Sequence, residues 1–160
     1  MACIYGPNER QEGFLLEAIS QMLTTKDTDV LRRSDFNVVP DALMDRSVQR
    51  YGQTGAYSVG FRHWLQEVGL TDVWRTCNPT QREYTFFSAS HQTYSRLDHF
   101  LVTPSPLHAI TQTTIGVAAL SDHAPTTLQF TVPARDGALG CGDSTPSFLV
   151  MQRCTRRQET

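Results

Sequence analysis

Apolar residues follow two different spacings along this chain, and the change from one to the other predicts interleaved strands and helices. Short apolar or β-branched runs bounded by turn residues are typical of strands, and apolar residues three or four positions apart are typical of helices. The expected strands span residues 2–5, 29–39, 84–87, 97–102, 110–117 and 125–132, and the expected helices span residues 9–23 and 61–70. Such interleaving favours an α/β domain, here a partial layered α/β sandwich with central sheets flanked by helices.

The segments between these elements carry turn and loop residues. Residues 40–57 are polar and predict a long surface loop in which Asp41 and Asp45 are solvated charges. The strands at residues 84–87 and 97–102 are separated by a polar turn, and their pairing as a hairpin is one expectation. The pattern is lost after residue 132, where glycines crowd together and arginines close the chain. We therefore expect one domain over residues 1–132 and an irregular, disordered tail over residues 133–160.

Composition and charge narrow the possible functions. With 160 residues and a hydrophobic fraction of 39%, the chain is large and apolar enough for one domain with a core. A net charge of −2, from 14 basic and 16 acidic residues, gives no broad electrostatic surface for nucleic acid, although an enzyme that contacts a few phosphates remains compatible. Four scattered cysteines without a C-x-x-C pair predict neither a zinc site nor a disulfide framework.

Targeting signals are not expected. No apolar run approaches the ~20 residues that cross a bilayer, and the first residues have no basic segment followed by a long apolar one. The expected location is intracellular, in the nucleus or the cytoplasm, with no membrane partner.

Side chains suited to phosphoester chemistry fall at the ends of three predicted strands. The first motif contains Asp35 and Asn37, the second contains Asp98, and the third contains Asp122 and His123. Carboxylates and a histidine gathered at strand ends are what a metal-assisted phosphoester hydrolase requires.

The first motif has two interpretations. On a strand, Asp35 and Asn37 are two positions apart and point to the same face, where they can orient a water and donate a hydrogen bond to a phosphoryl oxygen. Alternatively, aspartate and asparagine simply mark a turn, because both favour loops.

The other two motifs also have structural alternatives. Asp98 either forms a salt bridge with Arg96 on the same strand face or orients an imidazole, as the acid of a catalytic triad does. His123 suits proton transfer near neutral pH, and Asp122 is a hard oxygen ligand for Mg²⁺, although both residues also suit an ordinary surface loop. The other histidines show no ligand spacing and are expected to be structural: His63, His91, His99 and His108.

The order of these motifs resembles the C-terminal part of an endonuclease/exonuclease/phosphatase superfamily domain. More narrowly, it is similar to the endonuclease domain of LINE-type retrotransposon polyproteins. The resemblance covers about residues 1–130 and rests on several short segments. These segments are Ile4-Tyr5-Gly6-Pro7-Asn8, Ser34-Asp35-Phe36-Asn37-Val38-Val39, Asp45-Arg46, Tyr84-Thr85-Phe86-Phe87-Ser88, Tyr94-Ser95-Arg96-Leu97-Asp98-His99-Phe100-Leu101 and Ser121-Asp122-His123-Ala124-Pro125.

This resemblance implies DNA as the partner, Mg²⁺ or Mn²⁺ as the cofactor, and a role for each matching catalytic residue. Asp35 aligns or deprotonates the attacking water, and Asn37 supports the transition state. Asp98 orients the catalytic His123, and Tyr5 supports the scissile phosphate.

Three further residues are implied as contacts. Asn8 and Arg96 are expected to contact substrate, and Asp122 is expected to lie close to the metal. No small-molecule cofactor is expected.

The chain also departs from the pattern that it resembles. The family carries an asparagine and a metal-binding glutamate on strands before the Tyr5 motif, and this sequence begins inside that last strand. Arg32, Arg33 and Ser34 stand where small residues are usual. The expected function is therefore a retroelement-derived, metal-dependent DNA endonuclease domain that is truncated and weakly active or inactive. The alternatives are a non-catalytic remnant or interaction module, and a phosphatase of the same superfamily.

Overall fold

The structure is a computed structural model of the chain. It describes residues 2–5, 17, 31–35, 37–48, 55–119, 121–131 and 146–151, with the backbone alone for residues 2–5, 31–34, 55–58 and 146–151. Asn8 and the helix expected over residues 9–23, apart from Glu17, lie outside the described residues.

The central sheet brings the first two predicted motifs together. It contains β1 (Ala2–Tyr5), β2 (Leu31–Asp35), β6 (Asp98–Val102) and the short β3 (Thr71–Asp72), in the order β1-β2-β6-β3. β1 runs parallel to β2, with Tyr5 in register with Asp35. β2 runs antiparallel to β6, with Asp35 in register with Asp98. Three residues far apart in the sequence therefore occupy one row at the end of the sheet.

The hairpin expected between residues 84–87 and 97–102 does not form. β4 (Phe86–Ser88) pairs instead with β5 (Thr93–Ser95), and β6 leaves them to join the central sheet. All five residues of β6 are buried. Such a strand is favoured between two neighbours with both faces covered, which a two-stranded hairpin cannot provide.

A third sheet contains β7 (Ile110–Ile115), β8 (Thr126–Thr131) and β9 (Pro146–Met151), and a 3₁₀ turn, η1 (Ser105–Ala109), leads into β7. β9 pairs antiparallel with β8 over six residues. The expectation of an irregular tail over residues 133–160 is therefore wrong for residues 146–151. The run from Pro146 to Met151 is apolar enough for a strand, and β8 offers it an edge to pair with.

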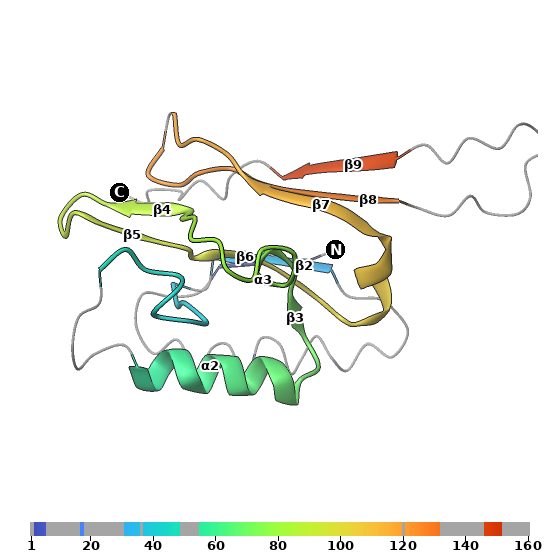
Figure 1. Cartoon of the computed structure of the whole chain (residues 1–160), viewed down its shortest axis with the longest axis horizontal. Coiled ribbons are helices and arrows are strands. Elements are labelled where there is room, and N and C mark those ends of the chain that lie inside the picture. Colours follow the sequence, from blue (N-terminus) through green and yellow to red (C-terminus); the bar gives the residue numbers. More distant parts are fainter. Residues whose placement is uncertain are drawn as a thin grey trace, which may run out of the picture.

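Two apolar clusters cover opposite faces of β6. Helix α2 (Gly55–Glu67) begins before the expected start at Phe61 and packs on one face. Its cluster consists of Val38, Phe61, Trp64, Leu65, Leu70 and Leu101. Gly69, at φ +67°, follows the helix in the left-handed conformation expected of it. In Figure 1, α2 lies on one side of β2 and β6 and the β7–β8–β9 sheet lies on the other.

The second cluster lies between β6 and β8 and consists of Val73, Phe100, Val102 and Leu128. Val73 begins a short helix, α3 (Val73–Cys77), which the sequence pattern did not predict. Asp72 caps this helix because its Oδ1 accepts the N–H of Arg75 at 3.2 Å. One turn of helix is too short to show an apolar period, so the only available signal was the capping residue.

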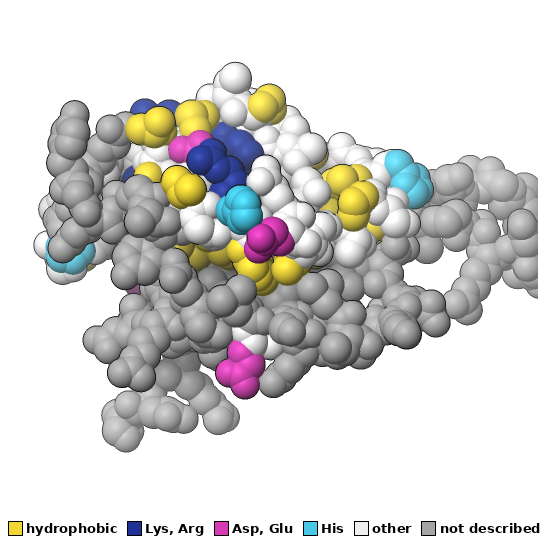
Figure 2. Space-filling model, turned by 90° about the horizontal axis from the view of Figure 1, so that it is seen from below, with side chains coloured by type: hydrophobic (Ala, Val, Ile, Leu, Met, Phe, Trp, Pro, Cys, Tyr) yellow, Lys and Arg dark blue, Asp and Glu magenta, His cyan; other side chains and the backbone are white. Residues whose placement is uncertain are grey.

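The surface on the α2 side is mixed in character. Figure 2 shows basic, acidic, histidine and hydrophobic side chains next to one another on this face. Arg62 pairs with Asp41 at 3.5 Å, and His63 lies 3.4 Å from Glu67. Among the described residues, no helix is both long and apolar enough to cross a bilayer.

Candidate active site

The imidazole of His123 lies between two carboxylates. Its Nδ1 is 2.8 Å from Oδ2 of Asp98, in a hydrogen bond that the ring donates because a carboxylate only accepts. Its Nε2 is 3.7 Å from Oδ2 of Asp35. We call Asp35, Asp98 and His123 the histidine cluster. The expected approach of Asp98 to His123 within hydrogen-bond distance is confirmed.

Strand register and a tied loop together build the histidine cluster. Asp35 and Asp98 face one another because β2 and β6 are antiparallel and these two residues are aligned. The loop that carries His123 is held along the start of β4. The N–H of Phe87 donates to the carbonyl of Asp122 at 2.9 Å, and the ring of Phe86 lies 4.8 Å from the imidazole.

Asn37 lies beyond the end of β2, and it contacts the histidine cluster through its backbone N–H. The strand ends at Asp35, and Asn37 has a φ of 54° in the left-handed region. Its N–H donates to Oδ1 of Asp35 at 3.0 Å. The expectation that Asp35 and Asn37 share one strand face is therefore wrong, because Asp35 is the last residue of the strand and Asn37 lies beyond its end. Asparagine suits that position because it tolerates positive φ better than most residues.

The charges of the cluster change the proton affinities of two groups. Burial alone would lower the pKa of His123, but the hydrogen bond and charge of Asp98, with the charges of Asp35 and Asp122, raise it above 6.5. Burial raises the pKa of Asp35 above 3.8, and the neighbouring charge of Asp98 raises it further, against the opposing effects of Asn37 and His123. The cluster therefore holds a proton more tightly than its isolated side chains would.

Arg96 is enclosed within the protein and does not face solvent, where a contact to substrate was expected. Its side chain is 0% exposed, and its Nε and Nη2 donate to Oδ1 and Oδ2 of Asp45 at 2.8 and 3.0 Å. Nη2 also lies 2.8 Å from Oδ2 of Asp72, and Nη1 lies 3.0 Å from Nδ1 of His99. We call Arg96, Asp45, Asp72 and His99 the arginine cluster. The ion pairs of Arg96 are therefore with Asp45 and Asp72 and not with Asp98, and its side chain is not exposed to solvent.

Asp45 is likewise not the solvated loop charge that was expected. It is 0% exposed, and its Oδ1 also accepts a hydrogen bond from Arg75 at 2.6 Å. A polar loop sequence cannot show that an arginine 51 positions later will enclose one of its carboxylates. The expectation that His99 is structural agrees with its burial at 1% exposure.

The described residues do not by themselves provide a complete site for a divalent metal ion. Among them, no group of three or more histidine, cysteine, aspartate or glutamate side chains is placed to hold one. Asp122 is exposed, and its Oδ1 accepts a hydrogen bond from Ser121 at 3.3 Å. A hard cation such as Mg²⁺ needs several oxygen ligands, so the described residues alone would hold one only weakly.

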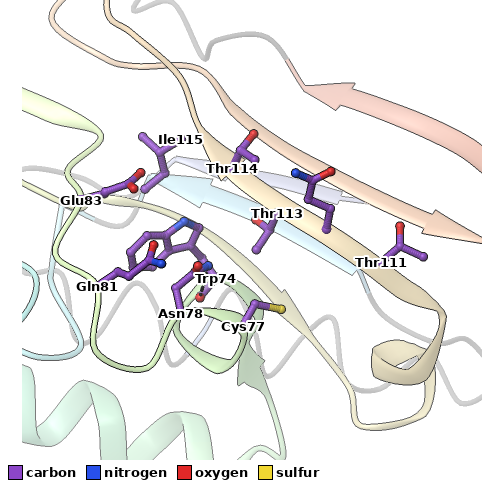
Figure 3. Close-up of a pocket in the computed structure, with 10 residues that line it drawn as sticks. Trp74, Cys77, Asn78, Gln81, Glu83, Thr111, Thr113, Thr114 and Ile115 are labelled. Atoms are coloured by element: carbon purple, nitrogen blue, oxygen red, sulfur yellow. Dashed lines mark hydrogen bonds between the residues drawn. The ribbon is translucent and has the colours of Figure 1, made fainter.

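A separate cavity of about 430 Å³ lies between β7 and the segment from α3 to Glu83 (Figure 3). Trp74, Cys77 and Thr113 are among its lining residues, and no member of the histidine cluster lines it. It therefore does not form part of the site around His123.

Thr85 contributes to the site by holding the backbone at Asp98, a role that was not predicted from the sequence. It is 1% exposed, and its Oγ1 accepts the N–H groups of Leu97 and Asp98. In the sequence it is one β-branched residue in an aromatic strand, a pattern that indicates a strand and carries no sign of this contact.

Comparison with known proteins gives one curated relative. No protein-family model matches the chain. A transposon TX1 uncharacterized 149 kDa protein from Xenopus laevis is 28% identical over 134 residues, which is 81% of this chain and 10% of that protein.

Three solved structures share the arrangement of elements. A 3′-5′ exonuclease, NExo, from Neisseria meningitidis has a TM-score of 0.60 and 25% identity, over 72% of this chain and 50% of that one. A structure described as 3′ phosphatase NExo from Neisseria bound to a product DNA hairpin has a TM-score of 0.57 and 24% identity over the same shares. An AP endonuclease from Archaeoglobus fulgidus has a TM-score of 0.60 and 20% identity, over 80% of this chain and 58% of that one. The chain therefore spans about half the length of these neighbours.

Proposed function

We propose that this chain, which has the α/β fold of the exonucleases and AP endonucleases in the endonuclease/exonuclease/phosphatase superfamily, is a DNA endonuclease domain that hydrolyses phosphodiesters. The observation that carries the proposal is the 2.8 Å contact between Asp98 and His123, with Asp35 facing the other ring nitrogen. The similarity to the transposon protein supports an origin in a LINE-type retrotransposon. We also propose that the two apolar clusters belong to the layered sandwich of that superfamily.

In this proposal, Asp98 holds the ring of His123 through Nδ1 and directs Nε2 toward Asp35. The 3.7 Å between Nε2 and Oδ2 of Asp35 exceeds a direct hydrogen bond, so the Nε2 proton is available to an oxygen of the substrate phosphate. The raised pKa of His123 keeps the ring protonated to higher pH, and a protonated ring stabilises the charge on that oxygen.

Asp35 takes the role of the base in the same proposal. Its raised pKa moves a carboxylate toward the range in which it can accept a proton from water and release it again. Oδ1 is held by the N–H of Asn37, and Oδ2 remains on the side of His123. Tyr5, whose backbone is in register with Asp35, and Asp122 are proposed as further contacts to the phosphate and the metal.

Dependence on Mg²⁺ or Mn²⁺ is part of the proposal, and weak activity follows from the site. The two buried carboxylates of the histidine cluster are engaged with His123 and Asn37, and no group of three possible ligand side chains among the described residues is placed to hold a metal ion. A metal would be bound weakly by so few ligands. We therefore expect slow cleavage by the chain as it stands.

The test is nicking of supercoiled plasmid DNA by the full chain with Mg²⁺ or Mn²⁺, over long incubations and with an EDTA arm. We compare the wild type with His123→Ala and with His63→Ala, a matched histidine change on α2 where the side chain is 70% exposed. The expected result is slow, metal-dependent nicking by the wild type and His63→Ala, and none by His123→Ala. Equal nicking by all three proteins would overturn the proposal. Rapid nicking by the wild type and His63→Ala, with none by His123→Ala, would contradict the expectation of weak activity.

A second candidate is a domain that binds DNA without cleaving it. The lack of a three-ligand metal cluster among the described residues favours this candidate. It predicts equal gel-shift affinities for the wild type and His123→Ala, and no metal-dependent nicking by either protein.

A further inference from the structure

Thr85 is hydrogen-bonded to both segments that carry the pair of Asp98 and His123. Its Oγ1 accepts the N–H of Leu97 at 2.9 Å and the N–H of Asp98 at 3.0 Å. Its carbonyl accepts the N–H of Ala124, next to His123, at 2.7 Å. The residue is 1% exposed, so water does not replace these contacts readily.

The two hydrogen bonds that Oγ1 of Thr85 accepts restrict the backbone conformation just before Asp98. Successive N–H groups of a strand point to opposite sides, so two neighbours can reach the same acceptor only where the strand structure is interrupted. This interruption lies between Ser95, the last residue of β5, and Asp98, the first residue of β6. Thr85 therefore stands where the chain passes from the hairpin into the central sheet.

We propose that Thr85 is a positioning residue for the histidine cluster, through its hydroxyl oxygen. The oxygen sets the start of β6 and hence the Asp98 carboxylate, and the carbonyl of the same residue sets the loop that bears His123. One residue thus fixes both partners of the 2.8 Å contact between Asp98 and His123. The consequence for cleavage rests on the proposed function, whereas the consequence for the hydrogen bond does not.

Three variants separate the oxygen from the rest of the side chain. Thr85→Val keeps the shape and removes the acceptor, and Thr85→Ser keeps the acceptor and removes the methyl group. Thr113→Val is the matched control, because Thr113 is 8% exposed and its Oγ1 donates to the carbonyl of Thr127 at 3.1 Å in another sheet. The Thr113 change therefore tests the general effect of removing a buried hydroxyl.

The first measurement is the proton resonance of His123 Nδ1 in the ¹⁵N-labelled full chain, assigned with His123→Gln. A strong hydrogen bond to a carboxylate moves this resonance downfield. We expect it in the wild type, Thr85→Ser and Thr113→Val, and we expect it to be lost or moved upfield in Thr85→Val. The second measurement is plasmid nicking, which should fall on the order of 10–10²-fold in Thr85→Val alone, because misplacement by ~1 Å costs up to that much.

An unchanged resonance in folded Thr85→Val would overturn the proposal. If Thr85→Val does not fold, Thr85→Ser decides, because that variant keeps the oxygen. Loss of the resonance in folded Thr85→Ser would overturn the proposal. Retention of the resonance in both Thr85→Ser and Thr113→Val would support it. Absence of nicking by the wild type with loss of the resonance in Thr85→Val alone would contradict the proposed function and leave the role of Thr85 intact.

Discussion

The arginine cluster and the histidine cluster each contain two aspartates and one histidine, and they differ in the presence of a guanidinium. In the arginine cluster, Arg96 bonds both carboxylates and approaches the imidazole. In the histidine cluster, the imidazole is the only basic group among its three members, and it lies between two carboxylates. In the first arrangement, Arg96 and the neighbouring Arg75 balance the two buried carboxylates, whereas the second leaves excess negative charge that a proton can reduce.

The pKa values show the consequence of this difference. Burial alone would raise the pKa of Asp72, but the charges and hydrogen bonds of Arg96 and His99 together outweigh burial and hold this pKa well below 3.8. Burial and the charge of Asp98 instead raise the pKa of Asp35. A carboxylate held permanently charged serves structure, and a carboxylate close to protonation serves proton transfer. A shifted pKa would not by itself distinguish the two clusters, because each contains an aspartate whose pKa is shifted.

Arg96→Met should have the largest effect, and on stability. It leaves the buried carboxylate of Asp72 without its guanidinium partner and that of Asp45 with Arg75 alone, which costs on the order of 3–5 kcal/mol. Urea denaturation of the variant and the wild type measures this loss. The matched change in the other cluster, His123→Gln, should cost much less, and equal losses for both variants would remove the distinction between the clusters.

Asp98→Asn should act on cleavage instead. An amide can no longer stabilise a protonated His123, and we expect nicking to fall at least about 10²-fold, or ~2.7 kcal/mol in activation free energy. Urea denaturation should show a smaller change. Asp72→Asn is the control, because it alters a carboxylate of the arginine cluster, and it should lower stability more than Asp98→Asn does.

The pH dependence of stability should differ between the wild type and His123→Gln. The pKa of His123 is raised in the folded state, so its contribution to stability is complete below pH 6.5 and is lost as the pH rises through the folded pKa. The melting temperature of the wild type should therefore exceed that of His123→Gln by more at about pH 6 than at about pH 9. An advantage that grows with pH would contradict the assigned direction.

The smallest effect is expected at the surface. Arg62 lies 3.5 Å from Asp41, and their side chains are 54% and 31% exposed. Solvent screens such a pair, so Arg62→Ala should cost less than about 1 kcal/mol in urea denaturation, and added salt should reduce the difference further. A cost comparable to that of Arg96→Met would show that exposure does not separate these ion pairs.

Several elements were predictable because their signals are local. The apolar run at residues 2–5 forms β1, and the apolar face of α2 contains Phe61, Trp64 and Leu65 as expected. Gly69 follows α2 because few other residues adopt positive φ there. The start of α2 was placed too late because its first turn lies in a stretch that reads as polar.

The sequence also indicated which residues can form the candidate site, and its resemblance to a known family implied the pairing of Asp98 with His123, but it did not indicate which candidates would be excluded from the site. The order of the motifs pointed to Asp35, Asp98 and His123, which have the chemistry for proton transfer. Arg96 lies two positions before Asp98 and has equally suitable chemistry for phosphate, yet it lies in the arginine cluster.

Only the tertiary structure decided that outcome, because strand pairing and burial are non-local. The register of β2 with β6 places Asp35 opposite Asp98, and the fold encloses Arg96 between a loop carboxylate and the residue that caps α3. A local pattern indicates which face or turn a residue favours, but it does not indicate which distant charged side chain will pack beside that residue. The same reason explains why Thr85, whose two bonds reach 12 and 13 positions along the chain, was invisible in the sequence.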